Sequence, residues 1–218
     1  MPEVTAFNWV PDFAQGFVRD LRVRWALEEA GTTYTENLID HEGKLTAAYR
    51  MRQPFAQVPA YRDGPVDMFE SGAIVLRIAQ SSEALMPKDD VGRARTMSWV
   101  FAAMNSVEPV VMNVRIAELF WADEPWAADF GRKAGEMLTI RLQRLSDWLG
   151  TRDYLEDRFT AGDLMMACVL REIAGCEHLA PFPDLEAYCA RCTGRPAFGR
   201  ALAAQLKHFE TAGPAPVA

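Results

Sequence analysis

The first 86 residues switch between two hydrophobic periods, whereas the remainder carries almost only the helical one. A β-α-β start implies two parallel strands, and a turn signal at Asp63-Gly64 predicts an antiparallel hairpin after them. The predicted elements are strand 4–9, helix 17–30, strand 33–39, strands 58–62 and 66–69, and helix 70–80. Together they predict a small α/β domain whose mixed four-stranded sheet is packed with helices.

The second half predicts a helical bundle. Its apolar periodicity places helices at 93–120, 127–148, 164–173, 184–192 and 196–209. Pro87 and two aspartates mark residues 87–92 as a linker. We therefore expect an N-terminal domain at 1–86, an all-α C-terminal domain at 93–211, and a flexible tail at 212–218.

Composition and charge exclude several classes of function and cellular location. The 218 residues carry a net charge of −7 and a pI near 5.1, which disfavours nucleic acid as a partner. The longest apolar stretch, 96–107, is too short to cross a bilayer, so no membrane role is predicted. No secretory signal is visible, and the four cysteines do not resemble a disulfide scaffold, so we expect a cytoplasmic protein with free thiols.

Residues 159–164 carry a clear sequence signal for the N-terminus of a helix. With Thr160 as the N-cap, Asp163 is at N3 and completes a capping box. Phe159 and Leu164 are spaced to form the hydrophobic staple across the same turn.

Four blocks together resemble the glutathione transferase superfamily. They are 23–31 (VRWALEEAG), 57–59 (QVP), 69–74 (FESGAI) and 158–164 (RFTAGDL). The resemblance implies a thioredoxin-like N-terminal domain that binds glutathione as a co-substrate, an all-helical C-terminal domain, and a homodimer. It also implies a transferase that conjugates the tripeptide to an apolar electrophile, with detoxification as the role.

The resemblance implies specific glutathione contacts. Val58 before a cis Pro59 would present its backbone to the cysteinyl part, as an added strand does. Ser71 and the free N–H groups of the helix it begins suit the γ-glutamyl carboxylate. Glu70 would accept from the γ-glutamyl ammonium, and Gln57 would reach the glycyl end.

The residue that activates the thiol departs from the family pattern. Members carry Tyr, Ser or Cys near the first helix, and residues 7–20 contain none of the three. Arg19 is the leading candidate, because a guanidinium in the first helical turn would stabilise a nearby thiolate. Asn8 and Trp9 are the alternative donors, and Arg19 could instead form a structural ion pair.

The second substrate would occupy an apolar, aromatic pocket. The residues expected to contact it are Trp9, Phe13, Phe17, Phe101, Met104, Asn105, Glu108 and Met112. Two further readings stay open. The bound thiol could serve as a peroxidase, disulfide reductase or isomerase, or the protein could bind glutathione without turnover in a regulatory role.

Two other features have structural explanations. Cys189 and Cys192 form a Cys-x-x-Cys late in the helical half, away from the strand-to-helix turn that redox pairs occupy, so packing explains them better. The three histidines, His41, His178 and His208, lack metal-ligand spacing, and we expect no metal site.

Overall fold

The computed structural model describes residues 1–211, and the predicted tail at 212–218 lies outside them. Two compact units divide the chain. Unit 1 contains Met1–Leu85 and the segment from Arg195 onward, and unit 2 contains Met86–Gly194. The last helix therefore groups with the first 85 residues, whereas the sequence pattern placed it with the helical half. Along residues 1–211, no helix combines the length and apolar composition that crossing a bilayer requires.

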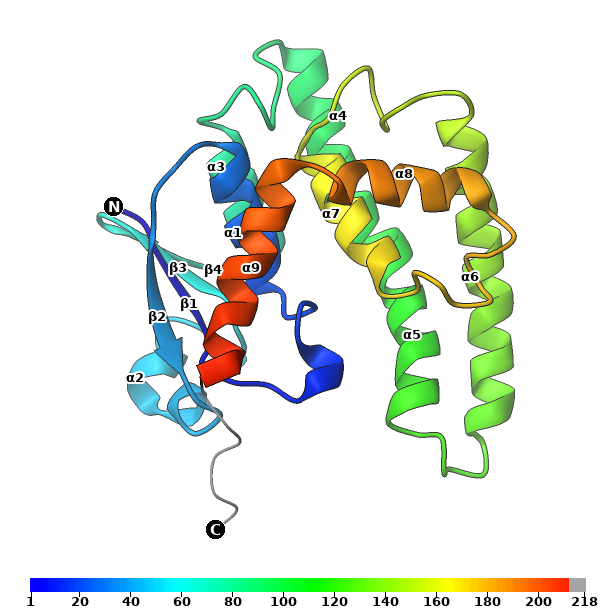
Figure 1. Cartoon of the computed structure of the whole chain (residues 1–218), viewed down its shortest axis with the longest axis horizontal. Helices are drawn as coiled ribbons and strands as arrows, with labels where there is room; N and C mark the ends of the chain where they lie inside the picture. Colours follow the sequence, from blue (N-terminus) through cyan, green and yellow to red (C-terminus); the bar gives the residue numbers. More distant parts are fainter. Residues whose placement is uncertain (212–218) are drawn as a thin grey trace. The chain divides into compact units, whose positions relative to one another are not determined.

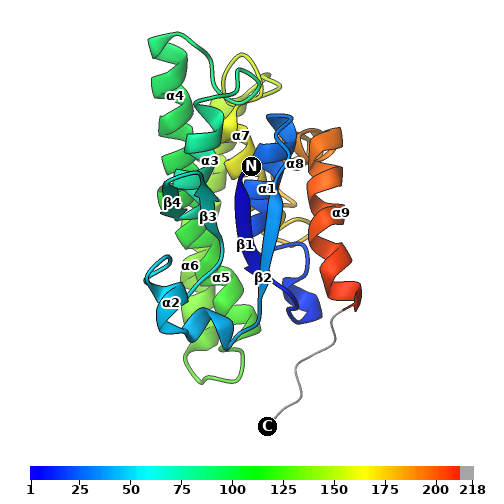
Figure 2. The same ribbon diagram turned by 90° about the vertical axis from the view of Figure 1, so that its left-hand side faces the viewer.

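Unit 1 is built on a four-stranded mixed sheet with the order β2-β1-β3-β4 (Figures 1 and 2). The strands are β1 (Glu3–Phe7), β2 (Thr35–Ile39), β3 (Ala60–Asp63) and β4 (Val66–Phe69). β1 and β2 are parallel because a helix connects them, and β3 is antiparallel to both β1 and β4. The predicted mixed sheet with helices and the hairpin are confirmed, although the two residues of the turn are Gly64 and Pro65, because Asp63 still belongs to β3 and pairs with Val66.

The helices of unit 1 include one that begins later than the pattern suggests. They are α1 (Asp20–Glu29), α2 (Ala47–Arg50), α3 (Ser71–Ala79) and α9 (Pro196–Thr211), with 3₁₀ turns at Asp12–Ala14 and Gly43–Leu45. The prediction that α1 begins at Phe17 is wrong. Gly16 has φ 81°, and the Phe17 N–H donates to Ala14 in a turn, so regular helix starts only at Asp20.

The core of unit 1 joins α1 to α9, which lie side by side in both views (Figures 1 and 2). Trp25 is fully buried, and its ring meets Phe198 edge to face with 4.8 Å between centroids. The two helices are also joined by ion pairs at the end of α1, from Arg195 to Glu29 and from Arg200 to Glu28, both at 2.6 Å. Apolar packing and edge charges thus hold α9 on the N-terminal fold.

Unit 2 is helical throughout its regular structure. Its elements are α4 (Asp90–Phe101), a π-helical segment (Ala102–Val107), α5 (Glu108–Leu119), α6 (Ala127–Leu149), α7 (Ala161–Arg171) and α8 (Pro183–Thr193). The helix predicted over 93–120 is present, since residues 90–119 are helical without a break, but it changes from α to π over 102–107. Pro109 lies in the first turn of α5 and has no N–H to donate, so the regular α-helical hydrogen-bond ladder is interrupted just before α5.

The capping box at the start of α7 is confirmed. Thr160 and Asp163 exchange the two expected hydrogen bonds, and Asp163 Oδ2 accepts from the Thr160 N–H at 2.8 Å. Asp163 Oδ1 also accepts from the Leu155 N–H at 2.8 Å and the Tyr188 hydroxyl at 3.0 Å. A fully buried carboxylate thus joins α7, α8 and the preceding loop.

Candidate functional site

Three chain segments meet at one end of the sheet of unit 1, and the strand register explains why. Ala60 pairs with Thr5 of β1 and with Phe69 of β4, and both pairings are antiparallel. Residues that precede β3 therefore lie beside those that follow β1 and β4. The residues in question are Asn8 and Trp9 after β1, Gln57 to Pro59 before β3, and Glu70 and Ser71 after β4.

The segment before β3 is anchored by its backbone. The Val58–Pro59 peptide bond is cis, as the resemblance implies. The Tyr49 hydroxyl donates to the Gln57 carbonyl at 2.7 Å, and burial raises the pKa of Tyr49 to about 12, so this donor stays protonated. Tyr49, Val58 and Ala60 form a buried cluster, while the Gln57 side chain is exposed. The edge of this segment is thus fixed by the core beneath it.

The start of α3 carries the second part of the site. Ser71 is 3% exposed, and Nη1 of the buried Arg22 lies 3.5 Å from its Oγ, at the outer limit of a hydrogen bond. Glu70 is the N-cap residue, with φ 70° and an exposed side chain. The first turn of any helix leaves backbone N–H groups without intrahelical partners, which suits a carboxylate ligand.

The backbone has unusual conformations in this region. Among residues 1–211, two non-glycine residues have φ in the left-handed region, Ala56 at 54° and Glu70 at 70°. Ala56 immediately precedes Gln57, and Glu70 immediately precedes Ser71. Such conformations cost roughly 1–3 kcal/mol each and gather at functional sites. One outlier therefore directly precedes the predicted glutathione contacts at 57–59, and the other, Glu70, is itself a predicted contact.

The candidates for thiol activation lie on the segment between β1 and α1. The Asn8 N–H donates to the Ile39 carbonyl at 2.9 Å, which continues the β1–β2 pairing by one residue, and Trp9 is half-buried. Arg19 is exposed and occupies the N-cap position of α1 instead of its first turn. The neighbouring Val18 packs against the cluster that contains Val58. The core thus brings the backbone next to Arg19 toward the segment that carries Val58.

Behind this segment lies a chain of charged groups. Asp20 is buried and accepts from Arg24 Nε at 2.7 Å, and Arg24 also donates to Glu36 of β2. Burial raises the pKa of Asp20, although Arg24 and Gln205 donate to it. Burial alone would lower the pKa of Arg24, but Asp20 and Glu36 raise it. Glu36 Oε2 lies 2.8 Å from His208 Nε2 of α9, so the chain runs from α1 through β2 to α9.

The residues predicted to contact an electrophile divide between the two units. In unit 1, Phe13 and Phe17 are exposed, beside the half-buried Trp9. In unit 2, the residues are placed as follows: Phe101 ends α4, Met104 and Asn105 lie in the π-helical segment, and Glu108 and Met112 lie in α5. Phe101 and Asn105 are exposed, Met104 and Met112 are half-buried, and Glu108 is buried.

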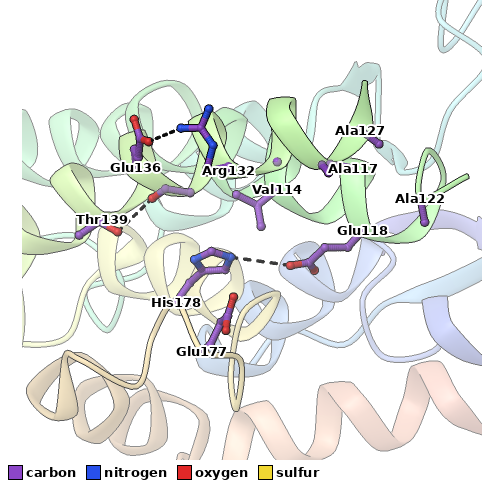
Figure 3. A pocket seen from close by; sticks show the side chains of 13 residues that line it. Val114, Ala117, Glu118, Ala122, Ala127, Arg132, Glu136, Thr139, Glu177 and His178 are labelled. Carbon is purple, nitrogen blue, oxygen red and sulfur yellow. Dashed lines mark hydrogen bonds and ion pairs between the residues drawn. The ribbon is translucent and has the colours of Figure 1, made fainter. Parts of the chain in front are cut away.

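A cavity of about 560 Å³ lies in unit 2, between α5 and α6 (Figure 3). A Cβ on Gly135 would lie 2.9 Å from Cε1 of His178, so glycine leaves room for the imidazole there. His178 Nε2 points toward Glu118 Oε1 at 3.7 Å. None of the residues predicted from sequence to bind glutathione or an electrophile lines this cavity. The residues predicted to bind glutathione lie instead at the sheet end of unit 1, where both backbone outliers occur.

Known proteins resemble this chain in sequence and in fold. Residues 3–80 match the model of the glutathione S-transferase N-terminal domain. A glutathione S-transferase from Hyoscyamus muticus is 29% identical over 164 residues, 68% of this chain and 75% of that protein. Residues 3–80 therefore belong to the glutathione S-transferase N-terminal domain family. Another relative, the disulfide-bond oxidoreductase YfcG of Escherichia coli, is 26% identical over 190 residues, 81% of this chain and 86% of that protein.

Solved structures share the fold of this chain. A glutathione transferase family member from Pseudomonas fluorescens, solved with two glutathione bound, has a TM-score of 0.80 at 22% identity and 92% coverage of both chains. Glutathione transferase F2 from Populus trichocarpa has a TM-score of 0.81 at 19% identity, covering 95% of this chain and all of its own length. At these identities the likeness establishes the fold, a thioredoxin-like domain followed by a helical one.

The Cys-x-x-Cys pair of the sequence lies in the helical unit. Cys189 and Cys192 are buried in α8, and burial raises the pKa of Cys189 to about 11 and that of Cys192 further above its ordinary value. Such thiols are poor nucleophiles at neutral pH. Within residues 1–211, no three His, Cys, Asp or Glu side chains gather in a way that could hold a metal ion.

Sequence reasoning missed the contribution of α9 to this region of the transferase fold. Gln205 Nε2 donates to the Val18 carbonyl at 3.1 Å and to Asp20 Oδ1 at 2.7 Å. One signal was available: Gln205 lies four residues from Ala201 and from Phe209, on a face that is otherwise apolar. A polar residue on a buried helix face predicts a specific partner, although the pattern does not name that partner.

Proposed function

We propose that this protein is a glutathione-dependent transferase that binds the tripeptide at the sheet end of unit 1 and conjugates it to an apolar electrophile. The observation that supports the site best is the pair of left-handed residues, Ala56 and Glu70, at or next to the predicted glutathione contacts. The β3–β4 register places these contacts at one end of the hairpin. The role in detoxification and the homodimer implied by the family belong to the same proposal.

Each part of glutathione has a matching group. The extended cysteinyl peptide pairs with the backbone of Val58, and Gln57 lies beside the glycyl end. The Ser71 hydroxyl and the first turn of α3 hold the γ-glutamyl carboxylate, where the positive end of the helix dipole favours an anion. Glu70 accepts from the ammonium group. The buried guanidinium of Arg22 near Ser71 Oγ adds positive charge behind the carboxylate.

The chemistry requires a thiolate. A glutathione-like thiol with a pKa of about 8.5 is only a few per cent ionised near neutral pH, and lowering that pKa by one unit is worth about 1.4 kcal/mol. We assign this task to Arg19, with Asn8 and Trp9 as alternative donors. The thiolate sulfur then attacks the electrophilic carbon, a C–S bond forms, and the leaving group departs with its electron pair.

The second substrate is an apolar molecule. Phe13 and Phe17 expose aromatic rings on the segment that also carries Trp9 and Arg19. Aromatic and apolar side chains around a few polar groups are typical of sites for hydrophobic small molecules. We propose that these rings contact the electrophile beside the bound sulfur.

A second candidate function is disulfide reduction, which the similarity to the oxidoreductase YfcG favours. In that reaction the glutathione thiolate attacks one sulfur of a substrate disulfide, and the other sulfur leaves as a thiolate. A second glutathione then attacks the mixed disulfide, releasing oxidised glutathione and the second substrate thiol. The bound tripeptide and its activation are the same as in conjugation.

Calorimetric titration with glutathione tests the site, and two activity assays then separate the reactions. We expect micromolar to millimolar binding, and conjugation of a chloronitrobenzene that exceeds reduction of a small disulfide. Faster disulfide reduction would favour the second candidate, and binding without either activity would indicate a non-catalytic protein. A protein that fails to bind glutathione would refute all three. Sedimentation in the same buffer measures the proposed homodimer.

A further inference from the structure

We propose that Gln205 of α9 is a positioning residue, which fixes the backbone of residues 18–20 and thereby sets the direction of the Arg19 side chain and the ionisation of bound glutathione. The inference rests on the proposed function, because it assigns Arg19 to the thiol. It adds a contribution from a residue that is far from the site in sequence and belongs to none of the predicted contacts.

One amide group spans the entrance to α1. Gln205 Nε2 donates to the Val18 carbonyl at 3.1 Å and to Asp20 Oδ1 at 2.7 Å, so the residues on both sides of Arg19 are held by the same nitrogen. This entrance lacks a side-chain N-cap hydrogen bond, because Arg19 occupies the cap position. The Gln205 amide, although it belongs to α9, therefore takes over part of the role of a local N-cap side chain, which is to fix the start of the helix.

The Gln205 side chain is buried, which makes its hydrogen bonds specific. Gln205 is 1% exposed, and within residues 1–211 its Oε1 is buried without a hydrogen-bond partner. A buried acceptor that lacks a partner is unfavourable, so packing alone does not explain a glutamine here. The favourable part is the bond to Asp20, whose carboxylate is buried and paired with Arg24. A charge-assisted bond of this kind is stronger and more directional than a neutral one.

The consequence for Arg19 follows from its two neighbours. Val18 packs inward against the cluster of Tyr49, Val58 and Ala60, and Asp20 points into the buried network. With both neighbours held on the inner side, the residue between them projects outward, and Arg19 is exposed. Loosening the Val18 and Asp20 contacts would let this short segment rotate, and the guanidinium would lose its fixed direction.

The test compares Gln205→Met with the wild type. Methionine keeps the length and fills the buried space but has no donor. The thiol pKa of bound glutathione is measured by the ultraviolet absorbance of the thiolate, together with kcat and KM against pH. We expect the thiol pKa to rise by about 0.5–1 unit, which lowers kcat roughly three- to tenfold below that pKa. We expect KM for glutathione to change less than about twofold, because the Ser71 and Val58 contacts are unaffected.

Further variants separate a positioning role from a structural one. Arg200→Gln removes an exposed ion pair on the same helix and should leave the thiol pKa unchanged. Gln205→Asn keeps the amide but shortens its reach, and serves if the methionine variant folds poorly. Arg19→Ala should raise the thiol pKa, and the double variant with Gln205→Met should raise it no further, since both act on one group.

Different results refute different parts. Additive shifts in the double variant, or an unchanged thiol pKa in both Gln205 variants when Arg19→Ala shifts it, would overturn the positioning role alone. An unchanged thiol pKa in Arg19→Ala would overturn the assignment of Arg19 and the inference with it. A wild-type protein that does not bind glutathione in the calorimetric titration would refute the proposed function itself.

Discussion

Removal of the Asp163 carboxylate should destabilise the protein more than any other single change at the start of α7. The side chain is fully buried and accepts from two backbone N–H groups, of Leu155 and Thr160, at 2.8 Å each. It also accepts from the hydroxyls of Thr160 at 3.1 Å and Tyr188 at 3.0 Å. Asp163→Ala leaves both N–H groups without acceptors in a site that water does not reach.

The expected loss is worked from these donors. An unpaired buried N–H costs about 1–3 kcal/mol, so the two together cost roughly 2–6 kcal/mol. The hydroxyls can turn to other acceptors, and burial raises the pKa of Asp163, so removing its charge returns part of the desolvation penalty. We expect a loss of about 3–4 kcal/mol in the free energy of unfolding. For a chain of this size that lowers Tm by roughly 6–16 °C.

Urea denaturation, monitored by far-ultraviolet circular dichroism, measures this loss of unfolding free energy. Two matched variants provide smaller losses for comparison. Asp163→Asn keeps one carbonyl oxygen and should lose about half as much as Asp163→Ala. Thr160→Ala removes the cap hydroxyl, which accepts from the Gly162 N–H and donates to Asp163, but leaves the carboxylate and its two backbone donors in place, and should lose about 1 kcal/mol. If Asp163→Ala loses less than Thr160→Ala, the carboxylate is not the centre of this network and the reasoning is refuted.

Three other changes test separate parts of the structure. Ser71→Ala should weaken glutathione binding about 10- to 150-fold in calorimetry, since a hydrogen bond to a charged group is worth about 1.5–3 kcal/mol, and undiminished affinity would contradict the proposed site. Iodoacetamide at pH about 8 should label Cys176 well before Cys189 and Cys192, because burial raises the thiol pKa of the latter two, and equal rates would argue against it. Burial alone would raise the pKa of Glu156, but an arginine and a tryptophan donate to it and lower it. That stabilisation is present above the unfolded pKa of about 4.3 and is lost as pH falls through the folded value. The stability difference between wild type and Glu156→Gln, about 1 kcal/mol at neutral pH, should therefore vanish in acid, whereas a gap that persists would exclude this carboxylate as its source.

The sheet could be predicted because its signals are local. Alternation in β1 and β2 and the Asp63-Gly64 turn signal specify neighbouring strands, and the register then follows from the hairpin. Where prediction failed, a local conformation interrupted a continuing apolar pattern. Gly16 delays the start of α1, and Pro109 interrupts the regular α-helical ladder within the helix predicted over 93–120, although the hydrophobic periodicity runs through both.

The partner of α9 could not be predicted, since amphipathic periodicity identifies a buried face without naming what covers it. Gln205 contacts residues more than 180 positions earlier, at Val18 and Asp20. Glu36 similarly pairs with His208 across 172 positions. Such contacts depend on how the finished helix packs, and no short-range motif encodes them.

The two parts of the proposed site differ in what holds them, and this difference predicts how they respond to change. The proposed glutathione contacts at Val58, just before β3, and at Ser71, just after β4, adjoin two strands whose pairing fixes the backbone. The segment between β1 and α1 has no such pairing beyond Asn8, and its conformation depends on turns and on side chains such as Gln205. Substitutions in residues 8–20 should therefore alter thiol ionisation more than glutathione affinity, whereas substitutions at Ser71 should do the reverse.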